Sequence, residues 1–177
     1  MNEKAQNIRL LAMDVDGVLT AGGIIYSDSG EELKVFNILD GLGLVAAVKS
    51  GLKTAIITGR TSGAVERRAN ELQVTYLVQG CRNKGAAVRR LMEETGLTRE
   101  QVAFVGDDLN DALAFREAGW RVAVRNASKD MKAQADYVTK QRGGEGALRE
   151  VVELILESQG KWADAVQNFI SDLEQSR

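Results

Sequence analysis

The most restrictive feature of the sequence is an alternation of short apolar runs with longer stretches of helical periodicity. Apolar runs that predict strands cover residues 10–13, 53–57, 74–78 and 102–105, and stretches spaced as amphipathic helices lie between most of them. Parallel strands require a crossover connection, usually a helix, so this order predicts parallel pairing. The sequence is therefore expected to fold as an α/β protein with a doubly wound parallel sheet.

Polar residues directly follow several of the predicted strands. The first strand ends at a carboxylate, with a second two residues later, and two other strands end in the same way: Asp14 and Asp16, then Thr58, Gly59 and Arg60, then Asp107 and Asp108. In open α/β sheets ligands bind beyond the carboxyl ends of the strands, so these side chains are expected to share one site. Asp14 and Asp16 can have different roles, since one carboxylate can act as a nucleophile while the other acts as a general acid or base.

The sequence contains no histidine and a single cysteine, Cys81, among its 177 residues. The absence of histidine excludes Ser-His-Asp and Cys-His catalysis and every imidazole metal site. One cysteine excludes an internal disulfide framework and a thiolate metal cluster. Acid-base chemistry must come from carboxylates, lysine or tyrosine. A metal would sit among oxygens, which favours Mg²⁺ or a similar hard cation.

Charge and hydropathy narrow the expected partners and location. The formal net charge is −2, with basic residues spread along the chain. This gives no general reason to expect a nucleic acid or an acidic surface as partner. No apolar run approaches membrane-spanning length, and the sequence does not open with a leader pattern. A cytoplasmic protein with neither a nucleic-acid nor a membrane partner is expected.

Two segments depart from the regular alternation. Residues 22–36 hold two β-rich runs around a turn-rich centre, which predicts a β-hairpin inserted after the first strand. Residues 161–177 predict an amphipathic helical tail, separate from a main domain over 1–160, because apolar residues recur at helical spacing: Trp162, Ala165, Val166, Phe169, Ile170 and Leu173. A two-stranded hairpin is marginal in water unless another surface covers it.

Taken singly, the polar residues at the strand ends are ordinary turn and helix-cap residues. Taken together, they describe a site. Carboxylates that converge without a cation repel one another and raise one another's pKa, so the acidic residues at these strand ends call for a metal ion. Lys84 at a predicted helix start, the Thr58 hydroxyl and backbone N–H groups are what the remaining oxygens of a phosphate require.

Four ordered motifs resemble those of the haloacid dehalogenase (HAD) superfamily of phosphotransferases. They begin at Asp14 (DVDGV), Ile57 (ITGR), Asn83 (NKG) and Gly106 (GDDLND). The resemblance spans about residues 8–156 and implies a HAD-like Rossmannoid fold. The hairpin in place of a cap domain, the Asp40-Gly41 pair and the glycine-rich segment at 143–147 resemble the sub-family that acts on 3-deoxy-D-manno-octulosonate (KDO) 8-phosphate.

This resemblance implies a role for each motif residue. Asp14 would be the nucleophile that forms an aspartyl-phosphate. Asp16 would protonate the leaving sugar oxygen and then deprotonate the attacking water. Mg²⁺ would be held by Asp14, the backbone carbonyl of Asp16, and Asp107. Asp108 and Asp111 would support the site, one of them orienting Lys84 or a metal-bound water.

Substrate contacts are expected from further residues of the same edge. Thr58 and Lys84 would hold the phosphoryl oxygens, and other contacts are expected from Asp40, Gly59, Arg60 and Arg68. Lys34 and Arg67 are additional candidates for binding a carboxylate. Relatives with this hairpin are homotetramers whose hairpins line a neighbour's site, so the resemblance also implies a homotetramer acting on a small phosphorylated sugar acid.

Three alternatives stay open at this point. The substrate can be a nine-carbon sugar-acid phosphate or another small phosphate ester. A receiver-type signalling switch also uses an acidic pair, a phospho-accepting Asp, a Thr and a Lys on a doubly wound sheet. A lasting phospho-Asp is incompatible with an acid-base residue at Asp16, which argues against that class. A catalytically idle binding module is disfavoured because no motif residue is missing.

Overall fold

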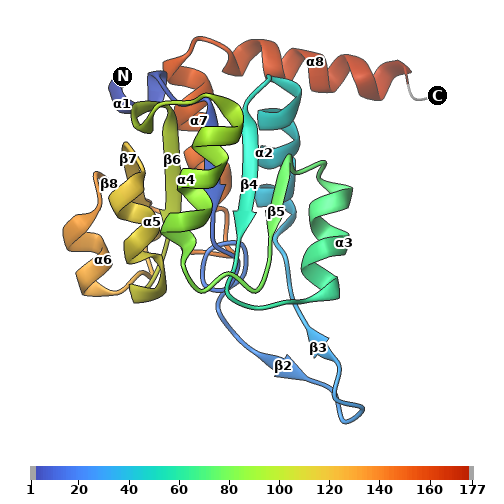
Figure 1. The fold of residues 1–177 in the computed structure, drawn as a ribbon. Helices are drawn as coiled ribbons and strands as arrows, with labels where there is room; N and C mark the ends of the chain where they lie inside the picture. Colours follow the sequence, from blue (N-terminus) through green and yellow to red (C-terminus); the bar gives the residue numbers. More distant parts are fainter. Residues whose placement is uncertain (1–2, 176–177) are drawn as a thin grey trace.

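The computed structural model describes residues 3–175 and has the expected α/β architecture. All six strands of the main sheet are parallel, in the order β5-β4-β1-β6-β7-β8 (Figure 1). They are β1 Leu10–Met13, β4 Lys53–Ile57, β5 Tyr76–Val78, β6 Val102–Gly106, β7 Trp120–Ala123 and β8 Tyr137–Val138. The four residues of β1 are buried between β4 and β6. Asp14, which follows β1, therefore lies near the middle of the carboxyl edge.

Helices cover both faces of the sheet (Figure 1). α2 Ile38–Lys49 and α7 Ala147–Ser158 pack together on one face, and α4 Lys84–Thr95 and α5 Ala112–Glu117 pack together on the other. The remaining helical segments are α1 Glu3–Gln6, α3 Gly63–Glu71, α6 Lys129–Gln134, α8 Trp162–Gln175, and the 3₁₀ turns η1 Arg99–Gln101 and η2 Leu109–Asp111. Within residues 3–175, no helix combines the length and the apolar character needed to cross a membrane.

The predicted elements are present, and their ends differ for local reasons. The sequence predicts that a helix opens at the Asp40-Gly41 pair. α2 begins earlier, at Ile38, because the Asn37 side chain accepts a hydrogen bond from Leu39 N at 2.8 Å and so caps the helix. The sequence did not predict α1 and α6. These helices have 4 and 6 residues, too few to show a helical repeat.

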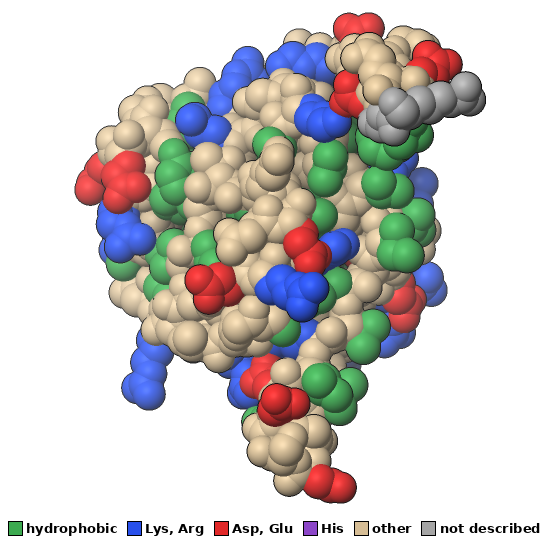
Figure 2. Space-filling view, turned by 90° about the vertical axis from the view of Figure 1, so that its right-hand side faces the viewer, with side chains coloured by type: hydrophobic (Ala, Val, Ile, Leu, Met, Phe, Trp, Pro, Cys, Tyr) green, Lys and Arg blue, Asp and Glu red, His purple; other side chains and the backbone are tan. Residues whose placement is uncertain are grey.

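The hairpin and the tail are both recognisable in the fold. In the hairpin, only β2 Ile25–Tyr26 and β3 Glu32–Leu33 pair as strands, and the whole segment projects beyond the carboxyl edge of the sheet (Figures 1 and 2). α8 packs on α2 and α7, where the Arg149 guanidinium lies 4.8 Å from the centroid of the Trp162 ring. The division into 1–160 and 161–177 stays a prediction, and its residues 1, 2, 176 and 177 lie outside the described part.

Candidate active site

Asp14 occupies the centre of the carboxyl edge and is almost entirely buried. Its backbone N–H donates to Val105 O at 3.0 Å, which continues the pairing of β1 with β6. Its Oδ1 accepts a hydrogen bond from Val15 N at 2.7 Å, and its Oδ2 lies 2.7 Å from Lys84 Nζ. The strand and these two contacts fix the carboxylate at the mouth of the site.

Lys84 is the buried cation of the site. It is the first residue of α4, its side chain is 1% exposed, and its Nζ also lies 2.7 Å from Asp111 Oδ1. Burial disfavours the charged form, but Asp111 and Asp14 outweigh burial and raise the pKa of Lys84. Lys84 therefore presents a fixed positive charge beside Asp14.

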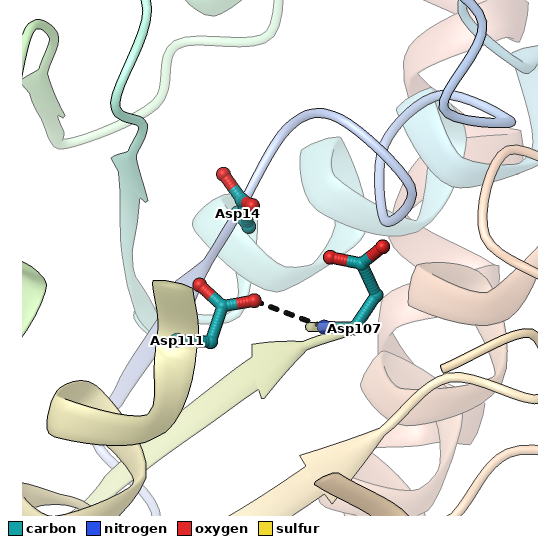
Figure 3. Close-up of side chains that lie close together, drawn as sticks. All are labelled: Asp14, Asp107 and Asp111. Carbon is teal, nitrogen blue, oxygen red and sulfur yellow. Dashed lines mark hydrogen bonds between the residues drawn. The ribbon is translucent and has the colours of Figure 1, made fainter. Parts of the chain in front are cut away.

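Three carboxylates converge at this edge (Figure 3). One oxygen each from Asp14, Asp107 and Asp111 lies within 4.8 Å of the others. Asp107 follows β6, and its backbone N–H donates to Asp111 Oδ2 at 2.9 Å, which joins the end of the strand to η2. Burial, with the charges of Asp111 and Asp14, raises the pKa of Asp107 to about 7. Burial and the charge of Asp14 raise the pKa of Asp111 to about 6.

The donor set of this cluster fits a hard divalent cation. Three carboxylates face a single lysine, Lys84. Its one positive charge does not balance the buried negative charge of the three carboxylates. Gly17, with φ +87°, lets Asp107 approach, because a Cβ at residue 17 would lie 2.0 Å from Asp107 Oδ2. An all-oxygen set of this kind is what Mg²⁺ prefers.

Asp16 faces the hairpin rather than the three-carboxylate cluster. Its Oδ1 lies 2.6 Å from Lys34 Nζ, and Lys34 Nζ lies 2.7 Å from Glu32 Oε1. Arg60 Nη2 lies 2.5 Å from Glu32 Oε2, and Arg60 Nε lies 4.0 Å from Asp16 Oδ2. The sequence singled out Lys34 only as a possible carboxylate binder and Glu32 not at all, because nothing in the pattern of a projecting hairpin shows that charged residues face inward.

Thr58 and Gly59 lie at the same edge, as expected. Met13 pairs with Ile56, so Thr58 extends β4 beyond the end of β1. Thr58 is 2% exposed and its backbone N–H donates to Val78 O at 2.9 Å. Gly59 follows in an exposed turn that leads to Arg60. Their contacts with a substrate stay predictions.

Three other predicted site residues are engaged elsewhere. Asp40 is 1% exposed, and its carboxylate accepts hydrogen bonds from Gly146 N at 3.2 Å and Arg149 N at 3.1 Å, at the start of α7. Arg68 lies between α3 and α2, 3.3 Å from Glu71 and 6.0 Å from the centroid of the Phe36 ring. Asp108 is exposed and caps η2. The carboxylate of Asp40 thus caps the start of α7, and its contact with a substrate stays a prediction. Of the two supporting acids, Asp111 rather than Asp108 contacts Lys84, alongside Asp14.

The comparisons with known proteins agree with this geometry. Residues 77–150 match the family model described as haloacid dehalogenase-like hydrolase. The chain is 48% identical over 162 residues to the KDO 8-phosphate phosphatase of Escherichia coli strain K12, an alignment that covers 92% of this chain and 86% of that protein.

Solved structures point in the same direction. A KDO 8-phosphate phosphatase from Moraxella catarrhalis, in complex with a magnesium ion, a phosphate ion and KDO, superposes with a TM-score of 0.91 at 46% identity, covering 94% of this chain and 96% of that one. The cobalt-bound enzyme from Haemophilus influenzae superposes with a TM-score of 0.89 at 38% identity, covering 95% and 99%. The likeness thus extends over nearly the whole of each chain.

Proposed function

The chain belongs to the haloacid dehalogenase-like hydrolases and is a phosphatase, and from this premise we propose that it hydrolyses KDO 8-phosphate to KDO and phosphate. The observation that carries the proposal is the meeting of Asp14 with Lys84 and with two further carboxylates at the end of β1. That set supplies the positioning and charge neutralisation that phosphoryl transfer chiefly requires. The similar proteins named above act on this substrate, and the one from Moraxella binds KDO.

Asp14 is the nucleophile in this proposal. One of its carboxylate oxygens attacks phosphorus as the bond from phosphorus to the sugar oxygen breaks, which gives an aspartyl-phosphate. Asp16 gives its proton to the sugar oxygen, so KDO leaves as an alcohol rather than as an alkoxide. Asp16 then takes a proton from water, whose oxygen attacks phosphorus, breaks the bond to Asp14 and releases phosphate.

The other residues of the edge hold the reacting group. Mg²⁺ is the cofactor, and when bound it neutralises charge on the transferring phosphoryl group. Asp14, Asp107 and the backbone carbonyl of Asp16 would hold it. Lys84 Nζ, 2.7 Å from Asp14 Oδ2, and the Thr58 hydroxyl hold phosphoryl oxygens.

The hairpin supports an assembly in which subunits share their active sites. Its charged residues Glu32 and Lys34 face inward, while Leu33 and Val35 are 50% and 73% exposed. Figure 2 shows hydrophobic side chains on this projecting segment, where a monomer would leave them in water. A homotetramer in which each hairpin covers the site of a neighbour would bury these hydrophobic side chains.

The proposed location of the protein is the cytoplasm.

Phosphate release from a panel of esters tests the substrate. The panel contains KDO 8-phosphate, a nine-carbon sugar-acid 9-phosphate, glucose 6-phosphate and an aryl phosphate, each with Mg²⁺ or with EDTA. We expect kcat/KM for KDO 8-phosphate to exceed that for glucose 6-phosphate by at least about tenfold, because the sugar acid, unlike glucose, brings a carboxylate that the partly exposed Arg60 can bind. A preference for the nine-carbon ester, or equal rates on all four esters, would reject KDO 8-phosphate as the substrate.

The alternative functions lack an observation in their favour. Membership of a phosphatase family, at 48% identity to one member, supports hydrolysis over a receiver-type switch or a catalytically idle module. The nine-carbon ester remains the alternative that the panel separates from KDO 8-phosphate.

A further inference from the structure

We infer that Lys34 is a positioning residue for the reaction: from the hairpin, it holds the Asp16 carboxylate in the orientation needed for proton transfer. The inference rests on the proposed function, because it takes Asp16 as the acid. It assigns the hairpin a second task within its own subunit, besides covering the site of a neighbour. Proton transfer by Asp16 would thereby depend on the hairpin being correctly folded.

The burial of Lys34 is the first observation. Lys34 directly follows β3, on a segment that projects from the body of the protein, yet its side chain is only 2% exposed. Lysine is almost never fully buried unless its charge is paired. Here Nζ lies 2.6 Å from Asp16 Oδ1, so the side chain points back from the hairpin to the end of β1.

A second set of contacts holds Lys34 in place. Residues two apart share one side of a strand, so Glu32 lies on the same side as Lys34, and Glu32 Oε1 is 2.7 Å from Lys34 Nζ. Glu32 is fixed in turn by Arg60, which also donates a hydrogen bond to the Tyr26 hydroxyl at 3.2 Å. Residues from both hairpin strands and from the turn after β4 thus hold the lysine that contacts Asp16.

Asp16 depends on this contact more than on any other. Within the part of the chain that the structure describes, the hydrogen bond from Lys34 is the one its carboxylate accepts. Arg60 Nε, at 4.0 Å from Asp16 Oδ2, is beyond hydrogen-bond distance. Without Lys34 the Asp16 side chain would rotate away from the leaving oxygen, and a displacement of about 1 Å can cost about 100-fold in rate.

The test compares two leaving groups. Lys34→Met keeps the length of the side chain and removes its charge, and Lys34→Arg restores a cation. We expect Lys34→Met to lower kcat/KM for KDO 8-phosphate by at least about tenfold and kcat/KM for an aryl phosphate by less than about threefold. This ratio reports the formation of the aspartyl-phosphate, in which an aryl oxide leaves without a proton, and not the later attack of water that Asp16 assists for both substrates. Lys34→Arg should recover most of the loss.

A matched control and a double variant sharpen the test. Lys4 pairs with Asp136 at 2.8 Å at the opposite end of the sheet, so Lys4→Met should change neither rate. In an Asp16→Asn background, adding Lys34→Met should have no further effect on the sugar phosphate, because the residue that it positions is gone.

Four results for Lys34→Met would overturn the inference. They are no loss on either substrate, equal losses on both substrates, a loss confined to KM, and a full additional loss in the Asp16→Asn background. Asp16→Asn alone separates this inference from the proposed function. If Asp16→Asn lowers kcat/KM equally for both substrates, the acid role itself is wrong. If it slows only the sugar phosphate while Lys34→Met slows neither, the role of Lys34 alone is wrong.

Discussion

Lys84 is the residue on which the charge balance of the site depends. Its Nζ lies 2.7 Å from both Asp14 Oδ2 and Asp111 Oδ1, and the three side chains are 3% exposed or less. A buried charge that loses its partner costs far more free energy than the intact pair contributes. Lys84 therefore allows these carboxylates to be buried together before any metal binds.

Replacing Lys84 should reveal that cost as lost stability. In metal-free buffer, Lys84→Met is expected to lower the free energy of unfolding by about 3–5 kcal/mol, since Asp14 and Asp111 stay buried without a cation. Added Mg²⁺ should restore part of the loss. Urea denaturation with EDTA and with Mg²⁺ measures both effects. Lys4→Met is the control, and its loss should stay below about 1 kcal/mol because Lys4 is half exposed and Asp136 keeps Arg121 as a second partner. Similar small losses in both variants would contradict this account of the site.

The sequence predicted some site residues and missed the partners of others for a physical reason. Asp14 and Asp107 follow apolar strands, and the ends of parallel strands must meet at one edge, so their convergence could be inferred. The pairing of Lys34 with Asp16 could not, because it depends on how a two-stranded segment folds back over the sheet. A pattern of alternating residues says which ones share a side but not which side faces the site.

At the scale of elements, Asp40 ties α2 to α7. The N-cap residue that precedes α7, Gly146, has φ +100° and no side chain to cap the helix. The carboxylate of Asp40, from the first turn of α2, accepts hydrogen bonds from Gly146 N and Arg149 N instead. From the sequence, Asp40 was expected to be a site residue. A side chain that caps a helix distant in the sequence leaves no local signal of that role.

Asp40→Asn tests this capping role through its pH dependence. Asn presents one acceptor oxygen and an NH₂ group that would face a donor, so we expect a loss of about 1–3 kcal/mol at neutral pH. Burial raises the pKa of Asp40 in the folded state, against the backbone bonds from Arg149 and Gly146. The folded protein then binds the proton more tightly, so the stability from Asp40 is fullest below the ordinary Asp pKa and falls as the pH rises through the raised pKa.

The gap in unfolding free energy between wild type and Asp40→Asn should therefore widen in acid. Chemical denaturation at a series of pH values measures it. A gap that narrows as the pH falls would show that the pKa of Asp40 is lowered rather than raised. A loss of metal binding or of catalysis, with stability unchanged, would return Asp40 to the active site.

Element ends were less predictable than element types. The apolar run over residues 10–13 predicted β1 well, because all four residues of that strand are apolar and buried. The hairpin was predicted as two runs over 22–36, yet only two residues of each strand pair. Long-range contacts, such as those of Glu32 and Lys34 with Asp16 and Arg60, set its conformation.

For the whole molecule, metal binding should couple to stability. A ligand that binds only the folded state stabilises it by about 2.7 kcal/mol at 100 times its Kd. Mg²⁺ is therefore expected to raise the melting temperature of the EDTA-treated protein. Asp107→Asn should abolish most of that rise, because it removes one of the three converging carboxylates. The exposed neighbour Asp108 is the matched control, and Asp108→Asn should leave the rise intact. An equal rise in all three proteins would place the metal elsewhere.

Assembly is the second property of the whole molecule to test. Light scattering is expected to give the mass of a tetramer at micromolar concentration. Val35→Asp puts a charge on the exposed apolar side of the hairpin, so we expect it to weaken assembly and turnover of the sugar phosphate together. Val138, 40% exposed on β8, is the control, and Val138→Asp should leave assembly unchanged. A wild-type monomer with full activity would show that the hairpin is not shared.

The most direct test of the account is to trap the phosphorylated residue during turnover of KDO 8-phosphate. Borohydride reduces an aspartyl-phosphate to homoserine, which peptide mass spectrometry can locate. We expect homoserine at position 14 when substrate and Mg²⁺ are both present, and none when EDTA replaces Mg²⁺ or when Asp14→Asn replaces the nucleophile. Release of phosphate from KDO 8-phosphate with position 14 unreduced, or with homoserine at another aspartate, would contradict the mechanism.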